Sequence, residues 1–283
     1  MLIYYENEIG MIRFGGGNER WNITDYSGLS LAEKSFFTAS YAESPGQVTI
    51  REKAEARVIT LRGDYAGDGE ALSLGMRVLN KKGRLTVTDG VKTRCIEAYC
   101  SHFEMNKPCG IYREFVAQFT ADDPFFEGAE AIEMALYSRE DLVESKFTLP
   151  CVFTRRIMTS KVYNHGDVMT EPVFTIFCNR VSDSEEAGIL LKNETTGAQL
   201  RLLYVLQEGE TVTVDISRRR ITSDTIREDN NGGSLIFFMS EDTVLKNLYL
   251  VPGENQFSVT NFAVESDMLV TCRMKEKYLE AVM

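Results

Sequence analysis

Short runs of alternating apolar and polar residues, separated by turn residues, recur along this sequence and limit the folds open to it. Residues 58–62 form one such run and end at Gly63. Phe115, Ala117 and Phe119 lie on one face of another. Residues 85–88 meet Asp89-Gly90, the strongest short-range hairpin signal. Because side chains alternate faces along a strand, this pattern predicts antiparallel sheet and a mainly β fold.

One helix interrupts the strands of the first half. Asp68 is a residue type that caps helix N-termini, and Leu72, Met76 and Leu79 follow at helical spacing. This spacing predicts a helix that reaches about Asn80. The first half is therefore expected to be α+β, with sheets, one helix and a hairpin.

The pattern changes near residues 128–146, an acid-rich stretch with scattered apolar residues. Beyond it we expect only strands, which predict a β-sandwich. The expected domain boundary lies near residue 146, giving domains 1–146 and 147–283. The expected strands of the second domain cover residues 173–177, 188–191, 200–206, 211–216, 235–239, 244–251, 256–260 and 268–274.

Charge and hydropathy exclude several classes of protein. The 31 basic and 42 acidic residues give a net charge of −11. Residues 1–145 contribute 16 − 23 = −7 and residues 146–283 contribute 15 − 19 = −4, so neither half has the basic excess of a nucleic-acid-binding protein. The sequence lacks a run of 18 apolar residues, which argues against membrane insertion.

The first residues place acids where a signal peptide needs positive charge, so we expect synthesis in a cytoplasm. The Asn22 and Asn193 glycosylation sequons are then chance matches. The six cysteines need not pair in such a compartment.

Four residues in one stretch, Cys95, Cys100, His102 and Cys109, are of types that bind zinc. On an unbroken strand Cys95 points away from Cys100 and His102, so they cannot close a tetrahedral site without a bulge. Buried, inert thiols are expected instead. We expect no metal and no cofactor.

Candidate catalytic groups are sparse. His165 and Asp167 lie two residues apart in a turn, which does not make a catalytic triad. Asp122, Asp123 and Glu127 are three carboxylates after a strand, where acidic residues usually form turns. The glycines at 15–17 precede no helical pattern, so a phosphate-binding loop is not expected.

Arg218, Arg219 and Arg220 form the only basic run, between Asp215 and Asp224. A hairpin tip that neutralises acidic neighbours is the simpler interpretation. A phosphate or partner contact is the alternative. We expect no catalytic, cofactor-binding or metal-binding residues, and no enzyme activity.

A series of motifs, each mostly turn chemistry, occurs in a characteristic order from about residue 3 to the C-terminus. These motifs occupy residues 23–28, 38–42, 57–63, 77–80, 83–85, 119–126, 164–167, 170–176, 193–197, 214–216, 252–255 and 274–279. In this order and spacing the sequence resembles the distal tail (Dit) proteins of long-tailed siphoviruses, whose tails do not contract, and their prophage relatives. Glu280 departs from the pattern, because relatives tend to have glycine there.

The resemblance implies a virion protein of the tail tip that forms a ring, usually a hexamer, where the tail tube meets the tip or baseplate. The N-terminal domain would build the ring and a galectin-like β-sandwich would project outward. The implied partners are further copies of the chain, the tail tube protein, the tail-tip fibre protein and receptor-binding proteins. DNA would pass through the channel without specific binding.

Two other functions stay open. A saccharide-binding module in residues 147–283 could use Tyr163, Tyr204 or Tyr249 as an aromatic platform, since Trp21 lies in the other domain. A tail-associated wall hydrolase would depend on Asp122, Asp123 and Glu127.

Overall fold

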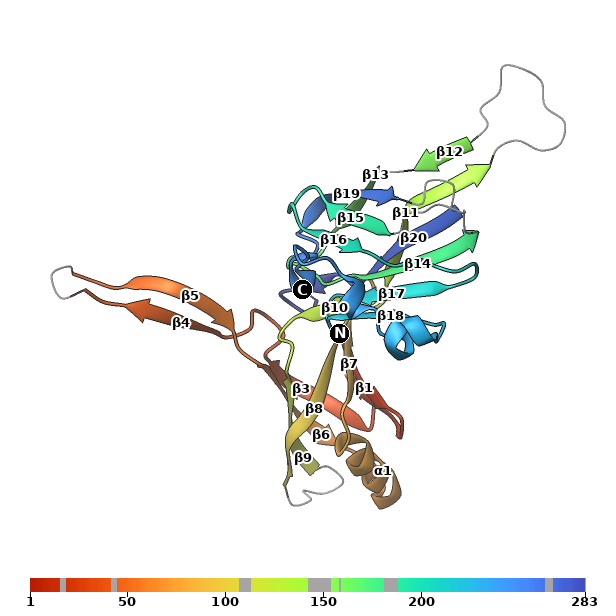
Figure 1. The fold of residues 1–283 in the computed structure, drawn as a ribbon. Coiled ribbons are helices and arrows are strands. Elements are labelled where there is room, and N and C mark those ends of the chain that lie inside the picture. The colour runs from red at the N-terminus through yellow and green to blue at the C-terminus, as the bar shows by residue number, and fades with distance from the viewer. Residues whose placement is uncertain are drawn as a thin grey trace. The chain divides into compact units, whose positions relative to one another are not determined.

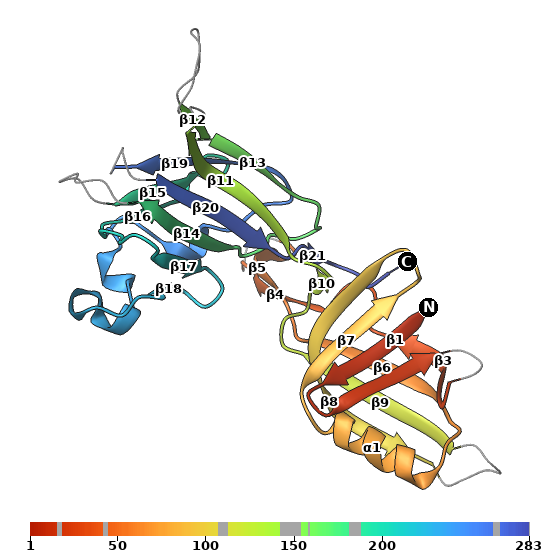
Figure 2. The same cartoon turned by 90° about the vertical axis from the view of Figure 1, so that its right-hand side faces the viewer.

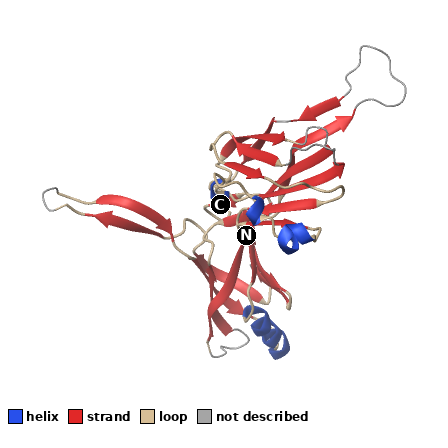
Figure 3. Cartoon of the chain, viewed as in Figure 1, coloured by secondary structure: helices blue, strands red, loops and turns tan. Residues whose placement is uncertain are grey.

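The structure, a computed structural model, is mainly β, as the alternating pattern predicted (Figure 3). Among the described residues the one α-helix is α1 (Gly69–Leu79), and no helix is long and apolar enough to cross a membrane. The described residues are 1–15, 19–41, 45–106, 113–141, 154–157, 159–180, 188–262 and 267–282.

The chain divides into two compact units, and the division differs from the expected boundary near residue 146. Unit 1 comprises Met1–Ala129 and Lys277–Met283, and unit 2 comprises Glu130–Glu276. The acid-rich stretch before residue 146 contains β11 (Ile132–Asp141), which pairs along much of its length with β20 (Asp267–Met274) of unit 2. Unit 2 is therefore an insertion between two segments of unit 1.

Unit 1 is built on a nine-stranded sheet that closes on itself (Figure 2). The long strand β8 (Thr93–Met105) pairs with β7 through its first half and with β9 through its second half. The other strands are β1 (Leu2–Asn7), β2 (Gly10–Gly15), β3 (Trp21–Ser27), β6 (Arg57–Tyr65), β7 (Gly83–Thr88), β9 (Arg113–Ala121), β10 (Phe126–Gly128) and β21 (Lys277–Tyr278).

The predicted helix and hairpin of unit 1 are both confirmed. The Asp68 side chain caps α1 by accepting a hydrogen bond from the Ala71 amide at 2.7 Å. The helix buries Val78 and Leu79, whereas Met76 is exposed, because Gly75 turns toward the sheet and lies against Trp21. A Cβ on Gly75 would lie 2.7 Å from the Trp21 ring, so the helix approaches the sheet through its glycine.

A second sheet of unit 1 is the hairpin of β4 (Lys34–Ala39) and β5 (Val48–Ala54). These strands pair only with each other among the described strands, and Figure 1 shows the hairpin extending from the nine-stranded sheet of the same unit. A register shift between Phe37 and Thr38 leaves Ile50 without a partner on β4. Such bulges twist a hairpin and re-aim its side chains.

Unit 2 packs two antiparallel sheets around one core (Figure 1). Phe174 of one sheet and Phe257 of the other meet edge to face, with ring centroids 5.6 Å apart. The six-stranded sheet has the order β12 (Thr154–Ile157), β11, β20, β14 (Val173–Arg180), β17 (Thr211–Asp215) and β18 (Arg220–Ser223). The four-stranded sheet has the order β13 (Thr159–Asn164), β19 (Gly253–Asn261), β15 (Ile189–Asn193) and β16 (Gln199–Leu202).

Two expected strands are wrong. Residues 235–239 and 244–251 contain the short 3-10 helices η2 (Ile236–Phe238) and η3 (Leu245–Asn247). Leu245 and Leu248 are both buried, and the Leu248 amide donates to the Leu245 carbonyl at 3.0 Å. A 3-10 turn places residues three apart on one side, whereas a strand would place Leu245 and Leu248 on opposite faces. A short apolar run is compatible with either structure, so the sequence pattern did not separate the two. The third 3-10 segment is η1 (Glu228–Gly233).

Candidate functional site

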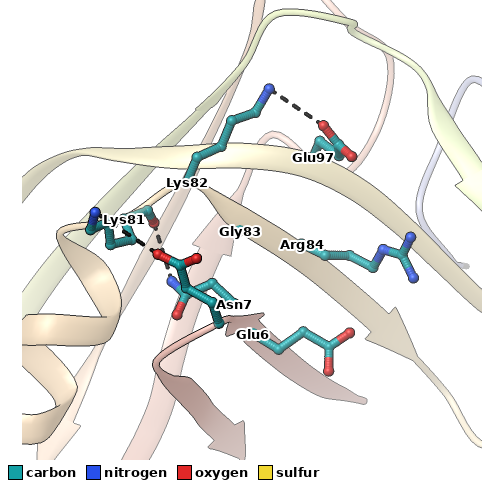
Figure 4. A pocket seen from close by; sticks show the side chains of 8 residues that line it. Glu6, Asn7, Lys81, Lys82, Gly83, Arg84 and Glu97 are labelled. Carbon is teal, nitrogen blue, oxygen red and sulfur yellow. Dashed lines mark hydrogen bonds and ion pairs between the residues drawn. The ribbon is translucent and has the colours of Figure 1, made fainter.

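One hollow of the described surface lies in unit 1, where α1 ends and β7 begins, and has a volume of about 650 Å³ (Figure 4). Asn7 fixes this corner by donating from its side-chain amide to the Val78 carbonyl at 2.8 Å, so it caps the C-terminal end of the helix. The lining residues are Glu6, Asn7, Glu8, Lys81, Lys82, Gly83, Arg84 and Glu97.

The charges of this hollow balance and pair locally. Lys82 lies 3.4 Å from Glu97, and Lys81 lies 3.9 Å from Glu8. Such exposed ion pairs exchange easily with water or another protein and contribute little stability. Two of the lining lysines already pair with lining glutamates, so the hollow offers paired charges to a polar contact.

The β4–β5 hairpin carries a second candidate surface, made of exposed apolar side chains. Phe36 and Phe37 are 56% and 55% exposed, and Ile50 is 71% exposed. Val48 and Leu31 are also exposed. Neighbouring Phe36 and Phe37 point to opposite faces of β4, so the hairpin carries apolar side chains on both sides. Sequence alternation could not single out this hairpin, because each of its faces mixes apolar and charged side chains, with Phe36 opposite Glu52 and Phe37 opposite Arg51.

An isolated two-stranded hairpin is marginally stable in water, and several large apolar side chains exposed on one such element favour an interaction site. We refer to Leu31, Phe36, Phe37, Val48 and Ile50 as the hairpin surface. Its geometry fits a protein contact in which both faces of the hairpin are covered.

The acidic group at Asp122, Asp123 and Glu127 follows β9. Asp123 accepts a hydrogen bond from the Phe125 amide at 3.1 Å and forms an ion pair with Lys277 at 2.8 Å. This carboxylate therefore shapes the exit turn and holds β21. Its geometry is that of a turn residue, which is how the acidic stretch was interpreted from sequence.

Of the cysteine and histidine residues of β8, Cys100 contacts His102 only through its thiol, which donates to the His102 backbone carbonyl at 3.4 Å. Cys95 is buried, Cys100 is half-buried and His102 is exposed beside Glu104. A bulge between Cys100 and His102 does break the strand, but within the described ranges no three His, Cys, Asp or Glu side chains gather to hold a metal. Cys109, Cys151 and residues 16–17 of the glycine stretch lie outside the described residues.

His165 pairs with Glu276 rather than forming a catalytic arrangement. Its Nδ1 lies 2.8 Å from Glu276 Oε1, and its backbone amide donates to the same oxygen at 3.0 Å. The ring lies against Tyr163, with centroids 4.6 Å apart and planes at 47°. Glu276 thus fixes an exposed pair of aromatic rings, a feature that the sequence did not reveal because Glu276 is 111 residues away.

The other aromatic candidates of unit 2 are not available as a platform. Tyr204 is buried and donates to the buried Glu210 carboxylate at 2.7 Å. Burial raises the pKa of Tyr204. Tyr249 is half-buried, and Trp21 of unit 1 is buried against Tyr65.

The arginine run forms the tip of the β17–β18 hairpin. The Asp215 side chain accepts from the Arg218 amide at 2.9 Å and lies 3.8 Å from the Arg218 guanidinium. Arg219 has φ of 54°, a left-handed turn conformation. The run therefore closes a hairpin and neutralises Asp215, as the simpler interpretation expected.

Comparison with known proteins gave matches among solved structures alone. No protein-family model matches the sequence, and no curated protein matches it. The Dit protein of phage SPP1, a paradigm of the hub adsorption apparatus in phages that infect Gram-positive bacteria, has a TM-score of 0.65 at 16% identity, covering 91% of this chain and 93% of that chain. A chain of the phage P2 baseplate in its activated conformation with Ca has a TM-score of 0.49 at 9% identity, covering 97% of both chains.

The chain therefore shares the fold of SPP1 Dit along most of its length. The resemblance predicted from the order of the sequence motifs is confirmed at the level of the fold.

Proposed function

We propose that this protein is a structural component of a phage tail, a ring-forming hub that joins the tail tube to the tail tip or baseplate and anchors the host-adsorption apparatus. The observation that carries the proposal is the likeness to a tail hub protein across both units. The chemistry of the surfaces agrees with a non-enzymatic role, since they offer apolar and paired charged contacts. Its location would be the virion tail tip, after synthesis and assembly in the bacterial cytoplasm.

The ring would be made by unit 1, with the hairpin surface as one side of each subunit contact. A closed ring needs a head-to-tail interface in which one surface meets a different surface of the next copy. The hairpin would supply one of these two surfaces, because the described part of its own chain leaves its apolar side chains exposed. We expect six copies, with the tail tube protein, the tail-tip fibre protein and receptor-binding proteins as further partners.

Electron microscopy with light scattering tests the ring directly. Purified protein, alone or with tube or tip protein, should give particles with six-fold symmetry. The double variant Phe36→Ser/Ile50→Ser should reduce ring formation at least about tenfold, because two exposed apolar side chains would leave the contact. Val91→Ser, at an exposed apolar residue of another hairpin, should assemble normally. Monomers only, even with partners present, would reject the ring.

The channel of such a ring would be acidic or neutral, so that DNA slides through without specific binding. Six copies would carry a formal charge of 6 × −11 = −66. Each lysine or arginine bound to a phosphate would slow passage, whereas like charges keep a layer of water and ions between wall and DNA. Duplex DNA should show no mobility shift at micromolar protein and physiological salt, and tight binding would contradict a conduit.

A second candidate function, saccharide binding by unit 2 at the host surface, is supported by the Tyr163–His165 pair. Tyr163 is 50% exposed on β13, and Glu276 holds the neighbouring ring in place. Lys161 and Glu254 form an ion pair of 2.9 Å on the adjoining strands, where Tyr163 is opposite Glu254. A fixed aromatic face beside such polar groups suits the C–H face and hydroxyls of a sugar.

A glycan array distinguishes this candidate from a purely structural role. If saccharide is bound, Tyr163→Ala should abolish the signal. Tyr26→Ala should keep the signal, because Tyr26 is equally exposed at 49% but lies in unit 1. Absence of any bound glycan with the full chain would reject saccharide binding and leave the hub proposal intact.

A further inference from the structure

A dense set of polar contacts outside the surfaces above gathers on one buried side chain, Arg57, at the start of β6. Only 2% of Arg57 is exposed. Its guanidinium donates to the carbonyls of Gly28 at 2.8 Å, Pro124 at 2.5 Å and Leu279 at 2.7 Å, and also to that of Ser30. The Phe126 ring lies 4.7 Å from its central carbon.

The four carbonyls that accept from Arg57 lie in three different segments of the chain. Gly28 and Ser30 lie on the chain entering the β4–β5 hairpin, and Arg57 itself lies just after the hairpin ends. Pro124 precedes β10, where the chain leaves unit 1 for unit 2, and Leu279 follows β21, where it returns. One side chain therefore holds both ends of the hairpin and both connections to unit 2.

Two backbone hydrogen bonds next to Arg57 extend the same junction. The Ala281 amide donates to the Leu29 carbonyl at 2.8 Å, which ties the returning chain to the segment before the hairpin. The Glu55 amide donates to the Glu33 carbonyl at 2.8 Å and closes the base of the hairpin. One amide therefore belongs to the returning chain and the other to the hairpin base, so they can report on each side separately.

Burying a charged guanidinium costs free energy, which the hydrogen bonds of Arg57 must offset. Burial lowers the pKa of Arg57 to about 10, and the guanidinium still remains charged at neutral pH. Its contacts are with carbonyl dipoles and an aromatic face. A planar fork of five donors can bind several carbonyls at fixed angles, which an ammonium group cannot do.

We propose that Arg57 is a positioning residue that couples the base of the β4–β5 hairpin to the two strands connecting unit 1 with unit 2. Ordering of the hairpin by a bound partner then stabilises the connecting strands, and ordering of those strands stabilises the hairpin base. Coupling of this kind is reciprocal by thermodynamic necessity. It is a property of the single chain and does not depend on the proposed hub function.

Hydrogen exchange of the full chain, at concentrations where it is monomeric, tests the coupling. In Arg57→Lys the amides of Glu55 and Ala281 should both exchange at least about tenfold faster, because loss of the shared donor opens both sides. The control is Arg62→Lys, on the same strand, whose exposed side chain forms an ion pair of 4.0 Å with Asp25. Acceleration at only one of the two amides would overturn the proposal.

A second variant perturbs the connecting strand β21 instead of Arg57. It tests the coupling even if Arg57→Lys fails to fold. Tyr278→Ala removes the ring that stacks 3.8 Å from the Arg94 guanidinium and so loosens β21. Faster exchange at Glu55, at the hairpin base, would support the coupling. Unchanged exchange at Glu55 together with faster exchange at Ala281 would show that the two sides are independent. Tyr99→Ala, at an exposed tyrosine of β8, is the matched control.

Discussion

At the scale of single residues, Gly28 shows how backbone geometry builds the junction around Arg57. Gly28 has φ of +84°, and a Cβ there would lie 2.0 Å from the Val58 carbonyl oxygen. Both the left-handed angle and the close approach require glycine. Gly28→Ala should lower the free energy of unfolding of unit 1 by about 3 kcal/mol, measured by urea denaturation.

Gly90 provides the control for this prediction, because it has a similar φ of +95° but open space, free of other atoms within 4 Å, where a Cβ would lie. Gly90→Ala should cost about 1 kcal/mol, the conformational contribution alone. Equal effects of the two substitutions would mean that the contact with Val58 contributes nothing.

At the scale of elements, the β4–β5 hairpin should be dispensable for folding and required for assembly. Its strands pair with no other described strand, and the Glu55–Glu33 hydrogen bond already brings its ends together. Replacement of Lys34–Ala54 by Asn-Gly should therefore change the Tm of unit 1 by only a few degrees and abolish rings in electron microscopy. A large loss of Tm would instead place the hairpin in the core of the unit.

At the scale of the whole molecule, the boundary between units predicts which fragment folds. Residues 130–276 contain every described strand of unit 2, whereas residues 147–283 lack β11, which lies between β12 and β20. The fragment 130–276 should unfold in one cooperative transition. The fragment 147–283 should be less stable and bind hydrophobic dyes, since the side of β20 that pairs with β11 would be unpaired.

The same two units should lose stability separately at alkaline pH. Burial raises the pKa of Cys272 from 9.0 to about 12 in unit 2 and that of Tyr5 from 10.0 to about 12 in unit 1. The unfolded chain then loses these protons first, so stability is complete below the unfolded pKa and falls as pH rises. Unit 2 should weaken from about pH 9. In unit 1 burial also raises the pKa of Cys100 from 9.0, so that unit should begin to weaken at about pH 9 too and lose the contribution of Tyr5 from about pH 10.

Trp21, the single tryptophan, lies in unit 1, so its fluorescence follows that unit, while circular dichroism follows both. Cys272→Ala should reduce the loss of stability of unit 2 between pH 9 and 12 and leave the pH dependence of the stability of unit 1 unchanged. An unchanged slope for unit 2 would show that the thiol does not titrate in this range.

Local structure, and the likeness to tail hub proteins, could be predicted from the amino-acid sequence alone. Alternation predicts strands because side chains alternate faces, Asp68 marks the start of α1, and Asp89-Gly90 marks a hairpin. These signals depend on neighbours within a few residues. Turn motifs in a fixed order carried the family resemblance for the same reason.

Which distant segments meet became known only from the folded chain. Ala281 and Val282 are buried in the core of unit 1, and Arg57 bonds Leu279, 222 residues away. The exposure of the hairpin surface was also known only from the structure, because it depends on what packs against a strand rather than on the strand's own residues. Pairing of distant strands is set by burial and long-range hydrogen bonds, which leave no periodic mark in the chain.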